Sequence, residues 1–289
     1  MDWERHKADW PHAAASRFVL SKPHKWHVQQ MGSGPLLLLI HGAGGSTQSF
    51  RHLMPLLARD YTVVAIDLPG QGFTRLGAQS RCGLGNIAED IAALCELEGW
   101  RPRAVIGHSA GAAVAFDLVP RLHGAAAPVI GINAALSNFK GVAGVMFPVM
   151  AKALAMMPGV AALFTASNGN PRSVERLISG TGSALPPEDL RYYGALVSDR
   201  GHVNATLQMM AQWDLGPLLA RLPHSSLRGL LITGKGDRAV PPAISRDMAV
   251  AMDGVEYTEL PDLGHLMHEE APKAVAELIL GYLAKNAPA

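Results

Sequence analysis

The stretch AVIGHSAG at residues 104–111 decides the fold. Its first three residues are a wholly apolar run, which is typical of a strand covered on both faces. The last five fit the pattern G-x-S-x-G, and an Ala-rich, helix-like stretch follows at residues 112–118. A serine in a sharp turn between a buried strand and a helix is the context that a nucleophile elbow requires.

Gly107 and Gly111 stand two residues on either side of Ser109, and their positions have a steric reason. The turn is so sharp that a Cβ at either position would collide with the neighbouring backbone. The turn also lifts the serine hydroxyl to the N-terminus of the following helix, where free N–H groups favour developing negative charge. We therefore predict that Ser109 is a nucleophile.

Similar apolar runs recur along the chain, and each stops at a loop that carries Gly, His, Ser, Asn or Asp. They occupy residues 36–40, 61–66, 129–132 and 230–233, with weaker strand character at 17–20, 26–30 and 255–260. Helix-like stretches lie between them, at residues 50–57, 87–97 and 271–283. This alternation predicts an α/β fold with a doubly wound, mostly parallel sheet. Ligands bind beyond the carboxyl ends of the strands in such sheets.

The alternation breaks between residues 134 and 219, where no convincing strand is present. The chain has no acidic residue between Asp117 and Glu175. We predict that residues 134–219 form a helical cap over the sheet edge. The cap would be inserted between two parts of an α/β core, residues 1–133 and 220–289.

Residues 142–164 are almost wholly apolar, and they suggest a lid. Met146, Met150 and Met157 are unbranched and polarizable, so they suit a large apolar ligand. One face of the run would then cover Ser109 and dip into a membrane interface. The plainer alternative is that these residues only pack the cap onto the core. A transmembrane span is a third interpretation, since about 20 apolar residues suffice, but Lys152 lies mid-run.

The composition excludes several classes of protein. Hydrophobic residues make up 48% of the 289 residues and charged residues 17%, which excludes a disordered chain. The net charge of +1, without a basic run, argues against a nucleic-acid partner. Cys82 and Cys95 form no CxxC pair, so a thiolate metal site is not expected and a reducing compartment is. The polar N-terminus lacks a secretory signal. We expect a cytoplasmic protein without a metal or cofactor.

A serine nucleophile needs a base that is oriented by an acid. In this type of sheet the chain order is Ser, then Asp or Glu, then His. His265 follows the run at 255–260 in the sequence Pro-Asp-Leu-Gly-His, and Asp237 follows the run at 230–233 through a Gly-rich turn. We predict that Asp237, His265 and Ser109 form a catalytic triad.

Other residues compete for these two roles. Asp262 and Asp214 are rival acids, whereas Asn133, at another strand end, cannot hold the charge that stabilises an imidazolium. His268 precedes two glutamates and is interpreted as a surface or packing residue. The remaining downstream histidines, in the cap or its return, lack a strand-end position: His202 and His224.

The oxyanion hole should consist of two backbone N–H groups. One is that of Ala110, directly after the nucleophile. The other comes from the loop HGAGG at residues 41–45, where Ala43 is the first choice of donor and Gly44 the second. A phosphate-binding loop looks similar, but neither G-x-x-x-x-G-K-[ST] nor G-x-G-x-x-G is present there. The segment DLPGQG at residues 67–72 is interpreted as a structural turn.

The motifs HGAGG, DLPGQG, GHSAG, GKGDRAVPP and LGHLMHEE occur in this order, and together they resemble the α/β-hydrolase fold superfamily. Gln71 and Thr74 depart from the His and Ser that are common in its structural turn. Further segments resemble the magnesium-chelatase accessory proteins of bacteriochlorophyll biosynthesis: MDWER at 1–5, WHVQQMG at 26–32, GTGS at 180–183 and MMAQWD at 209–214. This narrower resemblance implies a role near magnesium insertion into protoporphyrin.

Two functions follow as hypotheses. The first is a serine hydrolase that acts on an ester or thioester of an apolar small molecule, which could be a tetrapyrrole or an acyl ester. A dehalogenase is disfavoured, because its nucleophile would be Asp. The second is a non-catalytic accessory protein that binds a tetrapyrrole or the magnesium-chelatase subunits. Location in the cytoplasm, with peripheral contact to a membrane, fits both.

Overall fold

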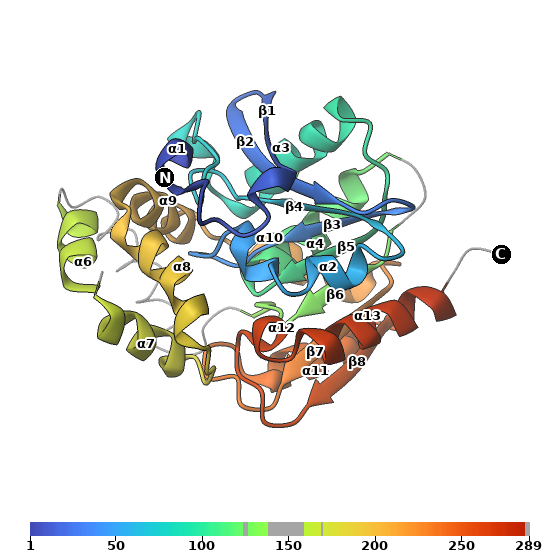
Figure 1. Ribbon diagram of the computed structural model, residues 1–289. Helices are drawn as coiled ribbons and strands as arrows, with labels where there is room; N and C mark the ends of the chain where they lie inside the picture. Colours follow the sequence, from blue (N-terminus) through green and yellow to red (C-terminus); the bar gives the residue numbers. More distant parts are fainter. Residues whose placement is uncertain (124–126, 138–158, 169, 287–289) are drawn as a thin grey trace.

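Eight strands lie within residues 1–123, 127–137, 159–168 and 170–286, the part of the chain that a computed structural model describes. The strands are β1 (Ser16–Ser21), β2 (His24–Met31), β3 (Leu36–Ile40), β4 (Thr62–Ile66), β5 (Pro102–His108), β6 (Val129–Ile132), β7 (Gly229–Gly234) and β8 (Val255–Leu260). They form one sheet in the order β1-β2-β4-β3-β5-β6-β7-β8 (Figure 1).

The sheet is parallel from β4 to β8, and β1 and β2 run antiparallel at one edge. The predicted doubly wound, mostly parallel sheet is therefore confirmed, including the two weak strands near the N-terminus. The apolar runs form parallel strands because both of their faces are covered. In β3, Leu37 and Leu39 pack into one core layer, and Leu38 and Ile40 pack into the other.

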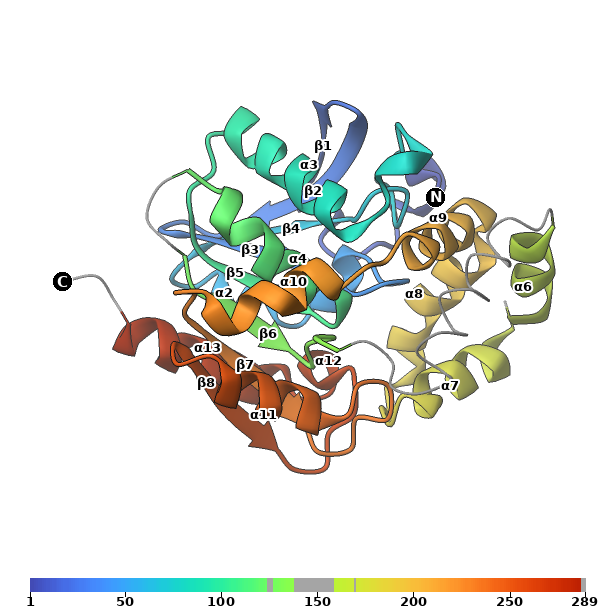
Figure 2. The same cartoon turned by 180° about the vertical axis from the view of Figure 1, so that it is seen from behind.

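Helices cover both faces of the sheet, as the two opposite views in Figures 1 and 2 show. Helices α3, α4, α10 and α11 pack on one face, and α2 and α13 pack on the other. The core helices are α2 (Met54–Leu57), α3 (Leu84–Leu97), α4 (Ala110–Leu118), α10 (Gly216–Arg221), α11 (Pro242–Ala251), α12 (Met267–Glu270) and α13 (Pro272–Lys285).

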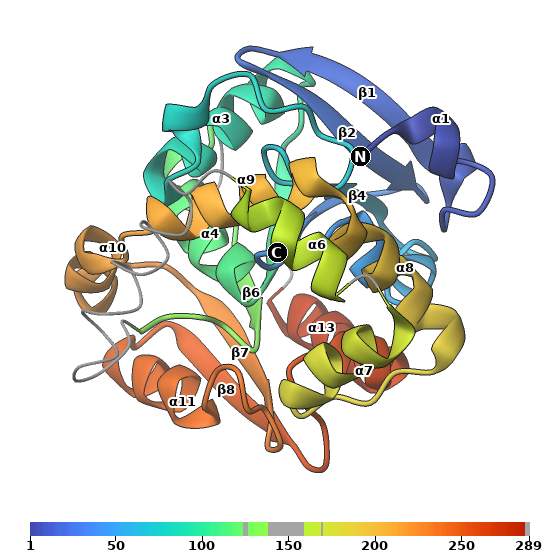
Figure 3. The ribbon, with the colours of Figure 1, turned by 90° about the vertical axis from the view of Figure 1, so that its left-hand side faces the viewer.

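The described part of the region between β6 and β7 contains helices and no strand. Besides α10, it holds α6 (Val160–Asn168), α7 (Pro171–Gly180), α8 (Pro187–Ser198) and α9 (Arg200–Ala211). Helices α6 to α9 pack against one another at one end of the sheet (Figures 1 and 3). We refer to α6–α9 and their loops as the cap. The predicted boundaries at 134 and 219 stay a prediction.

The first turns of the chain pack against the cap. Helix α1 (Trp3–His6) precedes Trp10, which is buried with Phe73 and with Tyr192 of α8 in a third hydrophobic cluster. The Trp10 ring lies edge-on to both of these rings. The cap is therefore joined to the core by an aromatic cluster as well as by the chain itself.

The expected helix at residues 50–57 is wrong in part. The chain forms a 3₁₀ turn at Thr47–Phe50 and then the four-residue α2. Pro55 explains the difference, because it has no N–H to donate and fits only the first turn of a helix. Among the described residues, no helix is long and apolar enough to cross a membrane.

Candidate active site

Ser109 lies between β5 and α4 in a strained backbone conformation, with φ 52° and ψ −118°. A positive φ is uncommon for a residue with a side chain, and such strain concentrates at functional sites. The turn is held in place by hydrogen bonds: the Ser109 N–H donates to Ile132 O at 2.9 Å, and its carbonyl accepts from Ala135 N at 3.1 Å. The side chain is only half-buried, whereas Ala110 and the rest of α4 are buried.

The two glycines of the elbow are required by close backbone approach, as the sequence predicted. A Cβ on Gly107 would stand 2.3 Å from Gly111 O. A Cβ on Gly111 would stand 2.2 Å from Ile40 O, at the end of β3. Contacts this short do not occur, so any side chain here would force β5, α4 and the loop after β3 apart.

The structure brings Asp237 and His265 together. His265 Nδ1 donates to Asp237 Oδ2 at 2.7 Å, and both residues are buried. The other carboxylate oxygen accepts from Ala239 N and Val240 N, each at 2.8 Å. The carboxylate is thus fixed by three hydrogen bonds and presents one oxygen to the imidazole.

The rival acids do not take this place. Asp262 is exposed, and it has φ 56° in the loop before His265. Asp214 is also exposed, and its side chain accepts from Gly216 N at the start of α10. Of the alternative bases, His224 is exposed as well. Contact geometry therefore favours Asp237 as the partner of His265.

Ser109 and His265 belong to adjoining loops, and both are described, but no hydrogen bond joins the Ser109 hydroxyl to the His265 ring. The link between their loops is the neighbour of the serine: His108 Nε2 donates to His265 O at 2.8 Å. Hydrogen bonds of catalytic groups are often long in unliganded enzymes and shorten when substrate binds. The loops of Ser109 and His265 therefore lie side by side, but the hydrogen bond between the Ser109 hydroxyl and the His265 ring is not formed.

Asn133 braces these loops, a role that the sequence did not indicate. Its Nδ2 donates to Gly264 O at 2.9 Å and to His265 O at 2.8 Å, and its Oδ1 accepts from Gly234 N at 2.9 Å. Asn133 has φ 46°, and its side chain is completely buried. The amide can donate and accept at once, which a carboxylate at this position could not do.

The loop after β3 approaches the serine from the other side. A Cβ on Gly42 would stand 3.0 Å from Ser109 Cβ, so this loop lies against the nucleophile. The Gly44 N–H donates to Gln71 Oε1 at 2.8 Å. Within the described residues, the N–H groups of Ala43 and Ala110 have no hydrogen-bond acceptor. This favours Ala43 over Gly44 as the second donor of an oxyanion hole.

The His108 ring packs against His265 and also against His268. The ring centroids of His108 and His265 are 4.7 Å apart, and those of His108 and His268 are 4.4 Å apart. Burial holds the pKa of His108 well below its ordinary value and lowers the pKa of His268 to about 3. The His108 and His268 rings are therefore neutral near pH 7. His268 is completely buried, so it is a packing residue.

A cap segment, Thr181 to Ala184, contacts the loop that carries Asp237 and the loop that carries His265. Arg238 N donates to Thr181 O at 3.0 Å, and Leu266 N donates to Ser183 Oγ at 2.8 Å. A Cβ on Gly182 would stand 2.1 Å from Gly236 O. The cap thus contacts the loop of Asp237 and the loop of His265 directly.

The remaining predicted residues are placed as follows. Met146, Met150 and Met157 lie outside the described residues, so the lid stays a prediction. Among the described residues, no group of three or more His, Cys, Asp or Glu side chains could hold a metal ion.

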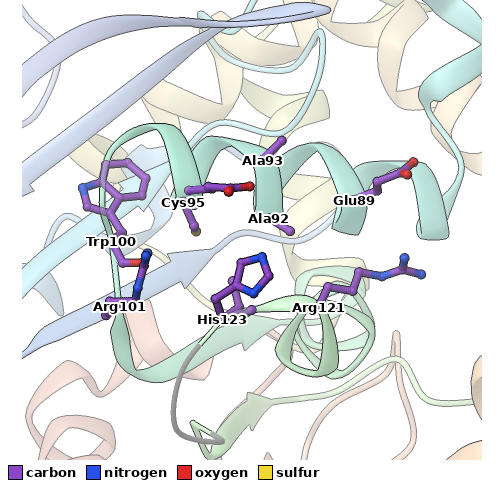
Figure 4. Close-up of a pocket in the computed structure, with 10 residues that line it drawn as sticks. Glu89, Ala92, Ala93, Cys95, Trp100, Arg101, Arg121 and His123 are labelled. Atoms are coloured by element: carbon purple, nitrogen blue, oxygen red, sulfur yellow. The ribbon is translucent and has the colours of Figure 1, made fainter.

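A surface cavity of about 270 Å³ lies between α3 and the chain after α4 (Figure 4). Cys95 and Glu89 of α3 line one side of it, and Arg121 and His123 line the other. It contains none of the predicted site residues. Burial raises the pKa of the Cys95 thiol to about 12, which favours the protonated thiol near pH 7.

Comparison with known proteins supports the α/β fold described above. Residues 37–278 match the family described as the alpha/beta hydrolase family. The chain belongs to this family. The match begins in β3 and ends in α13, so it covers the elbow and the loops of Asp237 and His265.

Two curated relatives and one solved structure illustrate the range of this family. The chain is 42% identical to the "Magnesium-chelatase 30 kDa subunit" of Rhodobacter capsulatus, over 98% of this chain and 99% of that protein. It is 29% identical to the pimeloyl-[acyl-carrier protein] methyl ester esterase of Aeromonas hydrophila, over 75% and 82%. The epoxide hydrolase CorEH superposes with a TM-score of 0.78 at 20% identity, over 93% and 98%, which supports the fold alone.

Proposed function

We propose that this protein is a serine hydrolase that cleaves an ester or thioester through an acyl-enzyme. The observation that carries the proposal is the buried Asp237–His265 hydrogen bond of 2.7 Å, beside a strained Ser109 at the start of α4. An imidazole held by a carboxylate and a serine on a sharp turn are the parts that acyl transfer needs. The family supports hydrolysis in general, and the residue roles are our assignment.

The reaction follows from these positions. Ser109 Oγ attacks the substrate carbonyl carbon while its proton passes to His265 Nε2, and the Asp237 carboxylate stabilises the imidazolium. The tetrahedral oxyanion accepts hydrogen bonds from Ala43 N–H and Ala110 N–H. The C–O or C–S bond then breaks, and His265 returns the proton to the leaving alcohol or thiol. A water molecule then attacks the acyl-enzyme carbonyl while its proton passes to His265. The bond to Ser109 Oγ breaks, His265 returns the proton to Ser109, and the acid is released.

The sequence identity to the magnesium-chelatase subunit supports a more specific proposal about the pathway. Similarity of 42% over nearly both whole chains favours a related role, so we propose that this hydrolase serves magnesium insertion in bacteriochlorophyll biosynthesis. Its substrate would be an apolar small molecule, a tetrapyrrole ester or an acyl ester, and its protein partners would be chelatase subunits. Peripheral membrane contact stays a prediction, because residues 142–158 lie outside the described part.

Hydrolysis of a chain-length series of p-nitrophenyl esters and acyl thioesters tests the proposal. We expect turnover by the natural chain and none by Ser109→Ala, with circular dichroism spectra that coincide. No turnover of any ester or thioester by the natural chain, together with a tetrapyrrole that co-purifies from the host, would instead favour the non-catalytic accessory protein. Absorption and mass spectra of the purified protein identify such a ligand.

A further inference from the structure

His202 of the cap helix α9 is hydrogen-bonded to two loops of the core. Its Nδ1 accepts from Gly72 N at 3.0 Å, and its Nε2 donates to Gly44 O at 3.2 Å. These two contacts fix the tautomer, with the proton on Nε2. The side chain is 2% exposed, and burial lowers its pKa to about 4, so the ring is neutral near pH 7.

Gly44 is the residue after the proposed oxyanion donor Ala43, and both of its backbone polar groups are engaged. The carbonyl is bound by His202, while the N–H donates to Gln71 Oε1 at 2.8 Å. Gln71 is itself held by α9, since its Nε2 contacts Met209 Sδ at 3.1 Å. Gly44 has φ 77°, a conformation that needs a glycine and external support.

Helix α9 also packs directly over these loops. A Cβ on Gly44 would stand 3.6 Å from Thr206 Cγ2, and a Cβ on Gly70 would stand 2.5 Å from Ala205 Cβ. The helix is anchored at its own start, where the Asp199 side chain accepts from His202 N at 2.8 Å. His202 and Thr206 therefore place α9 against Gly44, and Ala205 places the same helix against Gly70.

We propose that His202 is a positioning residue for catalysis: through Gly44 it orients the Ala43 N–H toward the oxyanion, so the cap completes the oxyanion hole. Gln71 assists from the opposite side of the same glycine. This inference rests on the proposed serine hydrolase, because an oxyanion hole matters only when an oxyanion forms. Donors of this kind act through their fixed direction, and a small misplacement weakens them.

Binding of an arylboronic acid measures this role, because boron bonded to Ser109 Oγ is tetrahedral and places an oxygen in the oxyanion hole. In His202→Phe, which keeps a ring and loses both hydrogen bonds, we expect boronic acid affinity and kcat to fall about 10- to 100-fold. KM for a short p-nitrophenyl ester should change little, since the ground-state carbonyl depends less on these donors.

Two conservative variants separate the oxyanion role from simple packing. The amide of His202→Gln can reach the Nε2 position and donate to Gly44 O, so it should restore most of the boronic acid affinity. The shorter His202→Asn can replace only the acceptor for Gly72 N, so it should stay impaired. Val203→Ala, at a buried residue on the same helix, is the control that loses packing alone and should keep natural affinity. Where His202→Phe does not fold, the Gln and Asn variants carry the comparison.

The outcomes distinguish this inference from the proposed function. If the natural chain hydrolyses esters and all His202 variants bind the boronic acid as it does, the positioning role is overturned and the hydrolase stands. Equal losses in His202→Gln, His202→Asn and Val203→Ala would also overturn it, because packing alone would then explain them. If the natural chain neither turns over esters nor binds the boronic acid, both proposals are overturned.

Discussion

Two sets of Ser, His and Asp side chains in the described part of the chain can be compared: Ser16–His27–Asp67 and Ser109–His265–Asp237. The first is a complete relay, in which His27 Nδ1 lies 2.7 Å from Asp67 Oδ2 and His27 Nε2 lies 3.0 Å from Ser16 Oγ. In the second set, only the hydrogen bond between His265 and Asp237 is formed. Hydrogen-bond distances alone would therefore select the first set as the active site.

The surroundings of the two serines reverse this choice. Ser16 has an ordinary extended backbone, with φ −83°, and its N–H donates to Ala13 O at the start of β1. Ser109 has a strained backbone and precedes a buried helix, and the next N–H, that of Ala110, has no acceptor among the described residues. A nucleophile needs donors for the oxyanion that it creates, in addition to a base and an acid.

The first set has a structural role instead. Asp67 also accepts from Thr47 N at 2.7 Å and from Phe73 N at 2.8 Å, so it holds the turn after β4. The His27 ring packs against Trp3 and Phe73. This relay therefore ties the N-terminal segment and β2 to the turn that carries Gln71.

The largest expected effect separates the two serines. Ser109→Ala should lower ester turnover by about 10⁴-fold or more, because no other group can form the acyl-enzyme. Ser16→Ala should leave turnover within about twofold of the natural chain, because Ser16 has an ordinary extended backbone at the start of β1 and its own N–H is bound to Ala13 O. Initial rates on one ester, measured for the three proteins at equal concentration, check this. Loss of turnover in Ser16→Ala alone would reverse the assignment.

The second effect concerns the acid of the candidate site. Asp237→Asn should fold normally and lower kcat by about 10⁴-fold, as the loss of the orienting carboxylate does in trypsin. Asp262→Asn and Asp214→Asn are controls at exposed positions and should retain full turnover. An inactive Asp262→Asn beside an active Asp237→Asn would show that the wrong carboxylate has been chosen.

A smaller effect is expected from the cap. Gly182→Ala requires a Cβ 2.1 Å from Gly236 O and a side chain at φ 87°, so the loop that carries Asp237 must shift. A displacement of this size should lower kcat about 10- to 100-fold. Gly180→Ala is the matched control, since its Cβ would meet nothing within 4 Å. Equal kcat in both variants would remove the cap from the positioning of the triad.

The smallest effect, on stability, distinguishes the two carboxylates. Asp67→Asn leaves buried N–H donors without a charged acceptor, so it should lower the free energy of unfolding by about 2–3 kcal/mol. Chemical denaturation followed by fluorescence measures the change. Turnover by the protein that remains folded should be kept, in contrast to Asp237→Asn.

The stabilisation by Asp67 should depend on pH in the acid range. Burial alone would raise the pKa of Asp67, but its pairing with His27 holds the pKa below the ordinary 3.8. The unfolded chain therefore takes up the proton first as the pH falls below 3.8, and the stabilisation by Asp67 is lost toward the lower, folded-state pKa. Asp67→Asn should flatten the pH dependence of stability in this range. An unchanged dependence would mean that Asp67 does not stabilise the turn.

The sheet and the second set could be predicted because each depends on local signals. Wholly apolar runs mark buried parallel strands, and the elbow, Asp237 and His265 each follow such a run. The contacts of Asn133, His202 and the Ser16 relay could not be predicted, since they join segments far apart in the chain. For example, 158 residues separate His202 from Gly44. The helix expected at residues 50–57 is wrong in part although its signal is local. The apolar spacing there indicates a helix, but Pro55 limits the helix to a start at Met54.

Covalent labelling tests the central claim most directly. The intact protein is treated with a fluorophosphonate, digested, and the modified peptide is identified by mass spectrometry. We predict one adduct, on Ser109, that is absent from Ser109→Ala and retained in Ser16→Ala. An adduct on Ser16, or none on the folded natural chain, would contradict the assignment of Ser109 as the nucleophile.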